Sequence, residues 1–318
     1  METYDPAASV GAGSIETMDA SITYRAHKFG GSSVADAERY RHVAALLQDS
    51  PAPRVVVVSA MQGVTDALIG LADAASRGGD WQAAWSQLRR RHLAEAERLD
   101  PRNSQALAAW FDSEFSSLSE SLGRIAGAGE FNDHAIAAIQ GLGEVWSSRL
   151  LQAALGGEAS GWARLDARDV LVVHPGELGV AIDWPRTRAL FAGWRAVHAQ
   201  RDVVVTGFVA RDTDGRNATL GRNGSDYSGA IFAVLFGASE LTIWTDVDGV
   251  LSADPRLVPD AVCLPSMSYA EACELAYFGA KVLHPQTMAP AMQAGLPILI
   301  RNSRNPAAPG TRIAANSI

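Results

Sequence analysis

The stretch that decides the fold is residues 219–248, which read TLGRNGSDYSGAIFAVLFGASELTIWTDVD. Its first part is a glycine-rich turn, in which Gly221 and Gly224 allow the backbone to approach a ligand closely. The apolar and small residues 227–236 then predict a buried helix, with Ser225-Asp226 as its N-cap. Because helix N-termini attract anions, we interpret the turn as an anion cradle.

A second polar loop follows the next apolar run. Residues 241–244 predict a strand that ends in Thr245-Asp246-Val247-Asp248-Gly249. Open α/β sheets bind ligands just outside the carboxyl ends of their strands, so the two loops are expected at neighbouring strand ends. Taken singly, each loop fits an ordinary polar turn about equally well. Asp226 and Asp246 are candidates to hold magnesium or an ammonium group.

The same order of strand, polar loop and helix appears twice near the start of the chain. Residues 22–29 predict a strand that runs into KFGGSSV at residues 28–34, and residues 55–58 predict one that runs into SAMQGVT at residues 59–65. A helical pattern follows each loop. Repeated units of this kind predict a doubly wound, mostly parallel α/β sheet.

Residues 80–126 have a different character, because their apolar side chains follow two helical stripes. We expect a helical insertion there, with His92 packed in it and the basic run Arg89-Arg90-Arg91 on a solvated face. A further helix, residues 142–155, has Glu144 in its first turn, where a helix-dipole cap is the simplest explanation.

Composition excludes several classes of protein. The chain has 318 residues, a net charge of -8 and two cysteines, Cys263 and Cys273. The acidic balance argues against an extended nucleic-acid surface, and no apolar run approaches the length of a membrane span. Residues 1–23 lack a secretory signal pattern, so we expect a cytoplasmic protein with reduced thiols.

The motifs exclude several kinds of phosphotransferase and hydrolase. The chain has no P-loop, no His-Arg-Asp catalytic loop and no nucleophile elbow. It has instead glycine-, serine- and threonine-rich loops that carry one positive charge each, at Lys28, Arg222, Arg256 and Lys281. Loops of this kind suit a polyphosphate.

Seven motifs together resemble the aspartate kinases. In chain order they are KFGGSSV (28–34), SAMQGVT (59–65), GE (143–144), GRNGSDY (221–227), WTDV (244–247), DPR (254–256) and FGAKV (278–282). The resemblance covers about residues 25–313 and is closest to the kinase half of bifunctional aspartokinase/homoserine dehydrogenases. It implies the amino-acid kinase fold, a three-layer αβα sandwich with a mostly parallel central sheet.

The domain organisation that this resemblance implies is simple. Residues 25–318 are expected to form the catalytic domain, and residues 1–24 a poorly ordered N-terminal extension. No C-terminal regulatory domain is expected in this chain. The resemblance leaves two assemblies open, a homodimer and membership of a longer bifunctional polypeptide.

The resemblance also implies a role for particular residues. Lys28, Asp226 and Lys281 would act in catalysis, and Thr65, Glu144, Arg222 and Ser225 would hold aspartate. ATP would be held by Lys28, Gly30, Gly31, Ser59, Thr245, Asp246, Arg256, Lys281 and Val282. Magnesium would be held mainly by the ATP phosphates, with no protein ligand assigned.

The implied reaction is ATP-dependent phosphorylation of the aspartate side-chain carboxylate, which opens the route to lysine, threonine and methionine. An aspartate side chain, with a pKa of about 3.9, is ionised at neutral pH, so this acceptor needs no general base. Two alternatives stay open. One is a kinase of glutamate or an acylated amino acid, and the other is a nucleotide-binding module without turnover.

Overall fold

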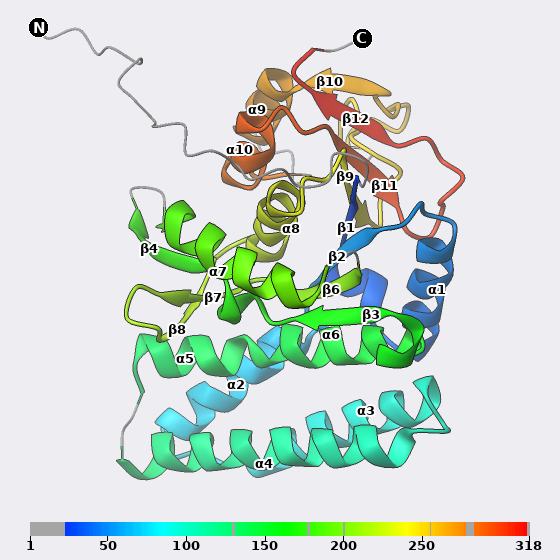
Figure 1. The fold of residues 1–318 in the computed structure, drawn as a ribbon. Helices are drawn as coiled ribbons and strands as arrows, with labels where there is room; N and C mark the ends of the chain where they lie inside the picture. The colour runs from blue at the N-terminus through cyan, green and yellow to red at the C-terminus, as the bar shows by residue number, and fades with distance from the viewer. Residues whose placement is uncertain are drawn as a thin grey trace, which may run out of the picture.

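The computed structural model describes residues 23–128, 131–176, 179–199, 201–254, 256–277 and 283–316. Their centre is an eight-stranded sheet in the order β10-β12-β11-β9-β1-β2-β6-β3 (Figure 1). The strands are β1 (Arg25–Phe29), β2 (Arg54–Val58), β3 (Trp162–Leu165), β6 (Asp202–Thr206), β9 (Leu241–Thr245), β10 (Ser266–Ser268), β11 (Ile298–Asn302) and β12 (Thr311–Ala314). All neighbours are parallel except β11 and β12. The predicted mostly parallel α/β sheet is confirmed.

Alternate side chains of each strand enter two separate apolar cores, as the pleat of a strand requires. Val55, Val57 and Ile243 belong to the core under α8 (Gly224–Leu235) and α10 (Pro285–Gln293). Val56, Val58 and Trp244 face the other core, which is covered by a second set of helices. These helices are α1 (Ala37–Gln48), α2 (Val64–Ser76) and α6 (Leu142–Ala154). The three layers predicted for the fold are therefore present.

The helical insertion forms an additional layer outside α2 and α6. It consists of α3 (Gln82–Leu99) and α4 (Ser104–Ala128), which lie together at the bottom of Figure 1. Phe111 and Phe115 of α4 are fully buried and belong to the same apolar core as α6. The insertion is thus packed onto the domain rather than attached by a linker.

A small second sheet, in the order β5-β4-β7-β8, lies beside the main one. Its strands are β4 (Val172–Gly176), β5 (Gly179–Ile182), β7 (Val209–Asp212) and β8 (Asn217–Thr219). The remaining helices are α5 (Asp133–Gln140), α7 (Trp184–Val197) and α9 (Tyr269–Tyr277), together with short 3-10 turns at residues 31–34, 158–160 and 167–169. None of the helices in the described residues combines the length and apolarity needed to cross a bilayer.

The domain core already includes residue 24. Tyr24 is 1% exposed, packs against Phe236 and donates a hydrogen bond to the carbonyl of Arg201. It therefore belongs to the domain core and not to an extension. Residues 1–22, which make up most of the expected extension, lie outside the described residues.

The register of three adjacent strands brings their carboxyl ends together. Phe29 of β1 is paired with Val58 of β2 on one side and with Trp244 of β9 on the other. The loops that begin at Gly30, Ser59 and Asp246 consequently leave the same edge of the sheet. This edge is where an open α/β sheet binds its ligand.

Candidate active site

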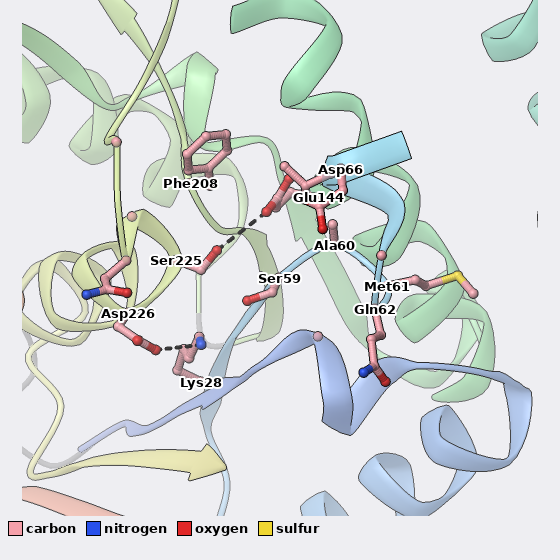
Figure 2. A pocket seen from close by; sticks show the side chains of 16 residues that line it. Lys28, Ser59, Ala60, Met61, Gln62, Asp66, Glu144, Phe208, Ser225 and Asp226 are labelled. Atoms are coloured by element: carbon pink, nitrogen blue, oxygen red, sulfur yellow. Dashed lines mark hydrogen bonds and ion pairs between the residues drawn. The ribbon is translucent and has the colours of Figure 1, made fainter. Parts of the chain in front are cut away.

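Lys28 and Asp226 form an ion pair at the carboxyl end of β1. The Nζ atom of Lys28 lies 2.5 Å from Oδ1 of Asp226, and the Lys28 side chain is 8% exposed (Figure 2). The lysine stem passes closely under α8, where a Cβ atom at Gly229 would lie only 3.1 Å from the Cβ of Lys28. The helix and the strand together hold this ammonium group in place.

The pair lies in the wall of an open cavity of about 420 Å³. Five chain segments contribute to this cavity: those after β1, β2 and β6, the start of α6 and the turn into α8. Its lining residues are Lys28, Gly31, Ser59, Ala60, Met61, Gln62, Gly63, Thr65, Asp66, Glu144, Phe208, Gly221, Asn223, Gly224, Ser225 and Asp226. The cavity combines backbone from glycine-rich loops with one buried cation and three carboxyl groups. Such a set suits a ligand with both anionic and cationic groups.

Glu144 supplies the most strongly perturbed group in the cavity. It is 3% exposed, and burial raises the pKa of its carboxyl to about 8, against hydrogen bonds and the charge of Lys28 that lower it. Its Oε1 atom accepts a hydrogen bond from Ser225 Oγ at 3.5 Å, whereas Oε2 has no partner among the described residues. Figure 2 shows the two side chains facing each other across the cavity.

Glycines allow the loops to approach this cavity closely. A Cβ atom at Gly31 would lie 2.9 Å from the carbonyl oxygen of Ala60, and one at Gly143 would lie 2.6 Å from the Ala60 Cβ. Neither position has room for a side chain. The loop after β1 and the start of α6 can therefore both contact the loop after β2.

The predicted N-cap of α8 is wrong. The helix begins at Gly224, and its N-cap is Asn223, which has a left-handed backbone with φ 57° and makes no side-chain cap hydrogen bond. Ser225 and Asp226 are instead in the first turn, where their side chains are free to line the cavity. The turn thus uses the tolerance of asparagine for left-handed backbone.

Several expected site residues do not line this cavity. Arg222 is exposed and lies between the lining residues Gly221 and Asn223. Thr245 donates a hydrogen bond to the exposed Asp246 at the end of β9, and Arg256 is 81% exposed and paired with Asp254. Gly30 adjoins the cavity through Gly31, and its amide donates to the carbonyl of Trp244. Lys281 and Val282 lie outside the described residues.

The cavity also contains residues that the sequence analysis did not select. Phe208 has a left-handed backbone, with φ 66°, and its ring packs where a Cβ of Gly224 would stand, 2.8 Å away. Asp66 adds an exposed carboxyl group in the first turn of α2. The available signal for Phe208 was its place just beyond the strand-forming run 203–206, after Gly207.

No group of three or more histidine, cysteine, aspartate or glutamate side chains is arranged to hold a metal ion within the described ranges. Asp226 is already paired with Lys28, which reduces its availability as a metal ligand.

The sequence matches the amino acid kinase family over residues 24–302, so the chain belongs to this family. It is 40% identical over 295 residues to the bifunctional aspartokinase/homoserine dehydrogenase 1 of Arabidopsis thaliana, covering 92% of this chain and 32% of that protein. It is also 36% identical to the bifunctional aspartokinase/homoserine dehydrogenase 2 of Escherichia coli, and this match covers 90% of this chain and 35% of that protein. The chain thus spans about a third of these relatives.

A solved structure shares the fold. E. coli aspartokinase III in complex with aspartate and ADP superposes with a TM-score of 0.83 at 29% identity, over 93% of this chain and 65% of that one. The structure of the same enzyme in complex with lysine and aspartate superposes with a TM-score of 0.82 at 30% identity, over 92% of this chain and 65% of that one. The fold class predicted from the sequence is therefore also that of a solved relative.

Proposed function

We propose that this chain is an aspartate kinase, which transfers the terminal phosphoryl group of ATP to the side-chain carboxylate of L-aspartate and forms 4-phospho-L-aspartate and ADP. The observation that carries the proposal is Glu144, a buried carboxyl with an unpartnered oxygen in the same cavity as Lys28. One group suits a substrate ammonium, and the other suits a phosphoryl group. The relatives named above are bifunctional aspartokinase/homoserine dehydrogenases and an aspartokinase, which supports the proposal.

In this proposal, the amino-acid substrate is held near α6 and α8. Glu144 accepts hydrogen bonds from its ammonium group, while Thr65 and Ser225 contact it through their hydroxyls. Arg222 lies next to cavity-lining residues on a flexible stem, so a rotamer change brings its guanidinium to a substrate carboxylate. Bidentate pairing of this kind is what arginine provides at carboxylate sites.

ATP is proposed to occupy the edge of the sheet between β1 and β9. Lys28, Gly30, Gly31 and Ser59 surround the phosphates, and Thr245, Asp246 and Arg256 lie toward the remainder of the nucleotide. Lys281 and Val282 are proposed to complete the site. Mg²⁺ held by phosphate oxygens would neutralise part of the polyphosphate charge.

The chemistry requires charge neutralisation more than proton transfer. A carboxylate oxygen forms the new bond to phosphorus as the bond to the ADP oxygen breaks, and no proton has to be removed from the ionised acceptor. Lys28, held by Asp226, opposes the repulsion between the carboxylate and the phosphates. Lys281 is proposed to act in the same way.

The main alternative is a kinase of another small acid. An acylated amino acid has no ammonium group for Glu144 to bind, so the buried carboxyl favours a free amino acid. Glutamate differs from aspartate by one methylene, and a nucleotide-binding module would show no turnover. ADP formation measured with aspartate, glutamate and N-acetylglutamate separates these cases, and turnover with aspartate far above the other two is expected.

We further propose a cytoplasmic location, because both cysteines are free thiols. A homodimer and membership of a longer bifunctional polypeptide are also proposed. Light scattering of the purified chain and the mass of the native polypeptide test these two assemblies directly.

A further inference from the structure

Arg91, a residue of the basic run in the helical insertion, contacts two loops of the candidate active site. Its Nη2 atom donates hydrogen bonds to the carbonyl oxygens of Ala35 and Gln62, each at 3.1 Å. Ala35 ends the turn that follows β1, and Gln62 lies in the loop that follows β2. One guanidinium nitrogen therefore joins two loops that are far apart in the sequence.

These two loops form one side of the cavity and contact each other directly. Gly31 lies against the carbonyl of Ala60, and the amide of Ser59 donates to the carbonyl of Phe29 at 3.1 Å. Because the two loops are in direct contact, a small separation between them would displace the amide of Gly31 and the hydroxyl of Ser59, which both line the cavity. Both groups belong to the proposed phosphate site.

A second contact from the same helix reinforces the first. Glu95, one turn after Arg91 in α3, accepts a hydrogen bond from the amide of Ala37 at 2.7 Å. The carboxylate thus binds the N-terminus of α1, where helix dipoles favour negative charge. Arg91 and Glu95 together fasten the chain segment 35–37 to the insertion.

The neighbouring arginines make different contacts. Arg89 pairs with Asp112 within the insertion, at 2.6 Å, and Arg90 lines a groove on its outer side. Only the third residue of the run, Arg91, has hydrogen bonds to the cavity loops among the contacts of the described residues. The run is therefore divided between the insertion and the candidate active site.

We infer that Arg91 is a positioning residue, which holds the loops after β1 and β2 in the arrangement that phosphoryl transfer requires. The inference rests on the proposed function. This role favours arginine over lysine, because the planar guanidinium carries several hydrogen-bond donors in fixed directions and stays charged. The lysine side chain is shorter and ends in a single ammonium nitrogen. The helical insertion would then act on catalysis through two backbone carbonyls.

The test compares Arg91→Ala and Arg91→Lys with the matched control Arg90→Ala. We expect kcat to fall roughly ten- to a hundred-fold in Arg91→Ala, since small misplacements remote from the reacting atoms have effects of this size. Arg91→Lys should be intermediate, and Arg90→Ala should stay within about twofold of the wild type. Affinity for ADP, measured by calorimetry, should weaken in the same order.

Hydrogen exchange separates a loss of loop positioning from a loss of global stability, because the latter would also speed exchange in the sheet. In the well-folded Arg91→Lys variant, the amides of residues 31–35 and 59–63 should exchange faster, while those of the sheet stay protected. Unchanged kcat, ADP affinity and exchange in this variant would overturn the inference, as would an equal loss in Arg90→Ala. If the wild type lacks aspartate kinase activity, the proposed function fails, and ADP affinity and exchange still decide the role of Arg91.

Discussion

At the scale of single residues, Glu144 links burial to substrate recognition. Its pKa of about 8 means that the empty site holds mostly a neutral carboxyl at pH 7, because burial penalises the charged form. A bound ammonium group would favour the charged form, so binding of aspartate should release a proton below pH 8. The apparent affinity for aspartate should therefore rise about tenfold per pH unit as the pH increases from 6 toward 8.

The variant Glu144→Gln keeps the shape of the side chain and removes this charge. Loss of a charge-assisted hydrogen bond is worth about 1.5–3 kcal/mol, so KM for aspartate at pH 8 should rise roughly ten- to a hundred-fold. Its pH dependence should also disappear, and KM for ATP should change far less. A variant that melts several degrees lower but binds aspartate normally would show that Glu144 only supports the start of α6.

Lys28 and Asp226 permit a second test at this scale. Lys28→Ala removes the cation that faces the transferring group and leaves the Asp226 carboxylate behind, so kcat should fall about 10²- to 10³-fold with a smaller change in KM. In the double variant with Asp226→Ala, no further loss is expected if Asp226 serves mainly to hold the lysine. Steady-state kinetics at saturating ATP measure both, and near-normal kcat in Lys28→Ala would exclude its catalytic role.

At the scale of elements, the approach of α6 to the loop after β2 determines where Glu144 lies. A Cβ atom at Gly143 would lie 2.6 Å from that of Ala60, so Gly143→Ala should force the two elements apart. We expect a several-fold increase in KM for aspartate. Ala60→Gly removes the opposing methyl group, and the double variant should recover most of the affinity, as a steric clash predicts. Equal kinetics in the single and double variants would contradict this packing argument.

The elements also show what the sequence allows one to predict. Aliphatic runs such as residues 55–58 identify buried parallel strands, and glycine-rich loops after them indicate ligand-binding strand ends, so the main sheet and Lys28 could be predicted from these patterns. Glu144 and Ser225 were expected in the site only through the resemblance to aspartate kinases, because their local positions also fit helix caps. The small sheet could not be predicted, because strands such as β8 are only three residues long and partly exposed. They are stabilised by pairing with distant strands, which leaves little local signal.

Residues whose placement depends on distant backbone could not be predicted from the sequence either. Asn223 was not expected as the N-cap because Ser225 and Asp226 have the same local propensity, and only the left-handed turn distinguishes them. The contacts of Arg91 are with carbonyls 56 and 29 residues away. Periodicity gives the face of a helix on which a side chain lies, but not the loop that a tertiary fold brings to it.

At the scale of the whole molecule, three buried titratable groups make stability depend on pH. The fully buried His92 donates from Nδ1 to the carbonyl of Leu88, and its Nε2 has no partner in the described part of the chain. Burial lowers the pKa of His92, and likewise that of His27, to about 4 from 6.5. Glu144 shifts in the opposite direction, from 4.5 to about 8.

The signs of these pKa shifts determine how the free energy of unfolding changes with pH. Between pH 6.5 and 4.5, the unfolded chain binds a proton at each histidine that the folded chain does not, so each histidine contributes a loss of about 1.4 kcal/mol per pH unit as the pH falls. Glu144 is protonated in the folded chain and ionised in the unfolded one over the same range, so it contributes a gain of similar size. The three groups together should therefore lower the free energy of unfolding by about 1.4 kcal/mol per unit of acidification.

Replacing His92 should remove this net dependence of the free energy of unfolding on pH. His92→Phe keeps an aromatic ring among Phe111, Phe115 and Trp146 and leaves no group to titrate, so the remaining contributions of His27 and Glu144 should nearly cancel. Urea unfolding at pH 6.5, 5.5 and 4.5 measures the difference in free energy between variant and wild type, which should shift in favour of the variant by about 1.4 kcal/mol per unit. The variant His174→Gln, which replaces an exposed histidine, serves as the control for the loss of a histidine as such. If the difference between His92→Phe and the wild type is the same at all three pH values, His92 titrates alike in the folded and unfolded chains, and its burial does not govern the acid stability of this core.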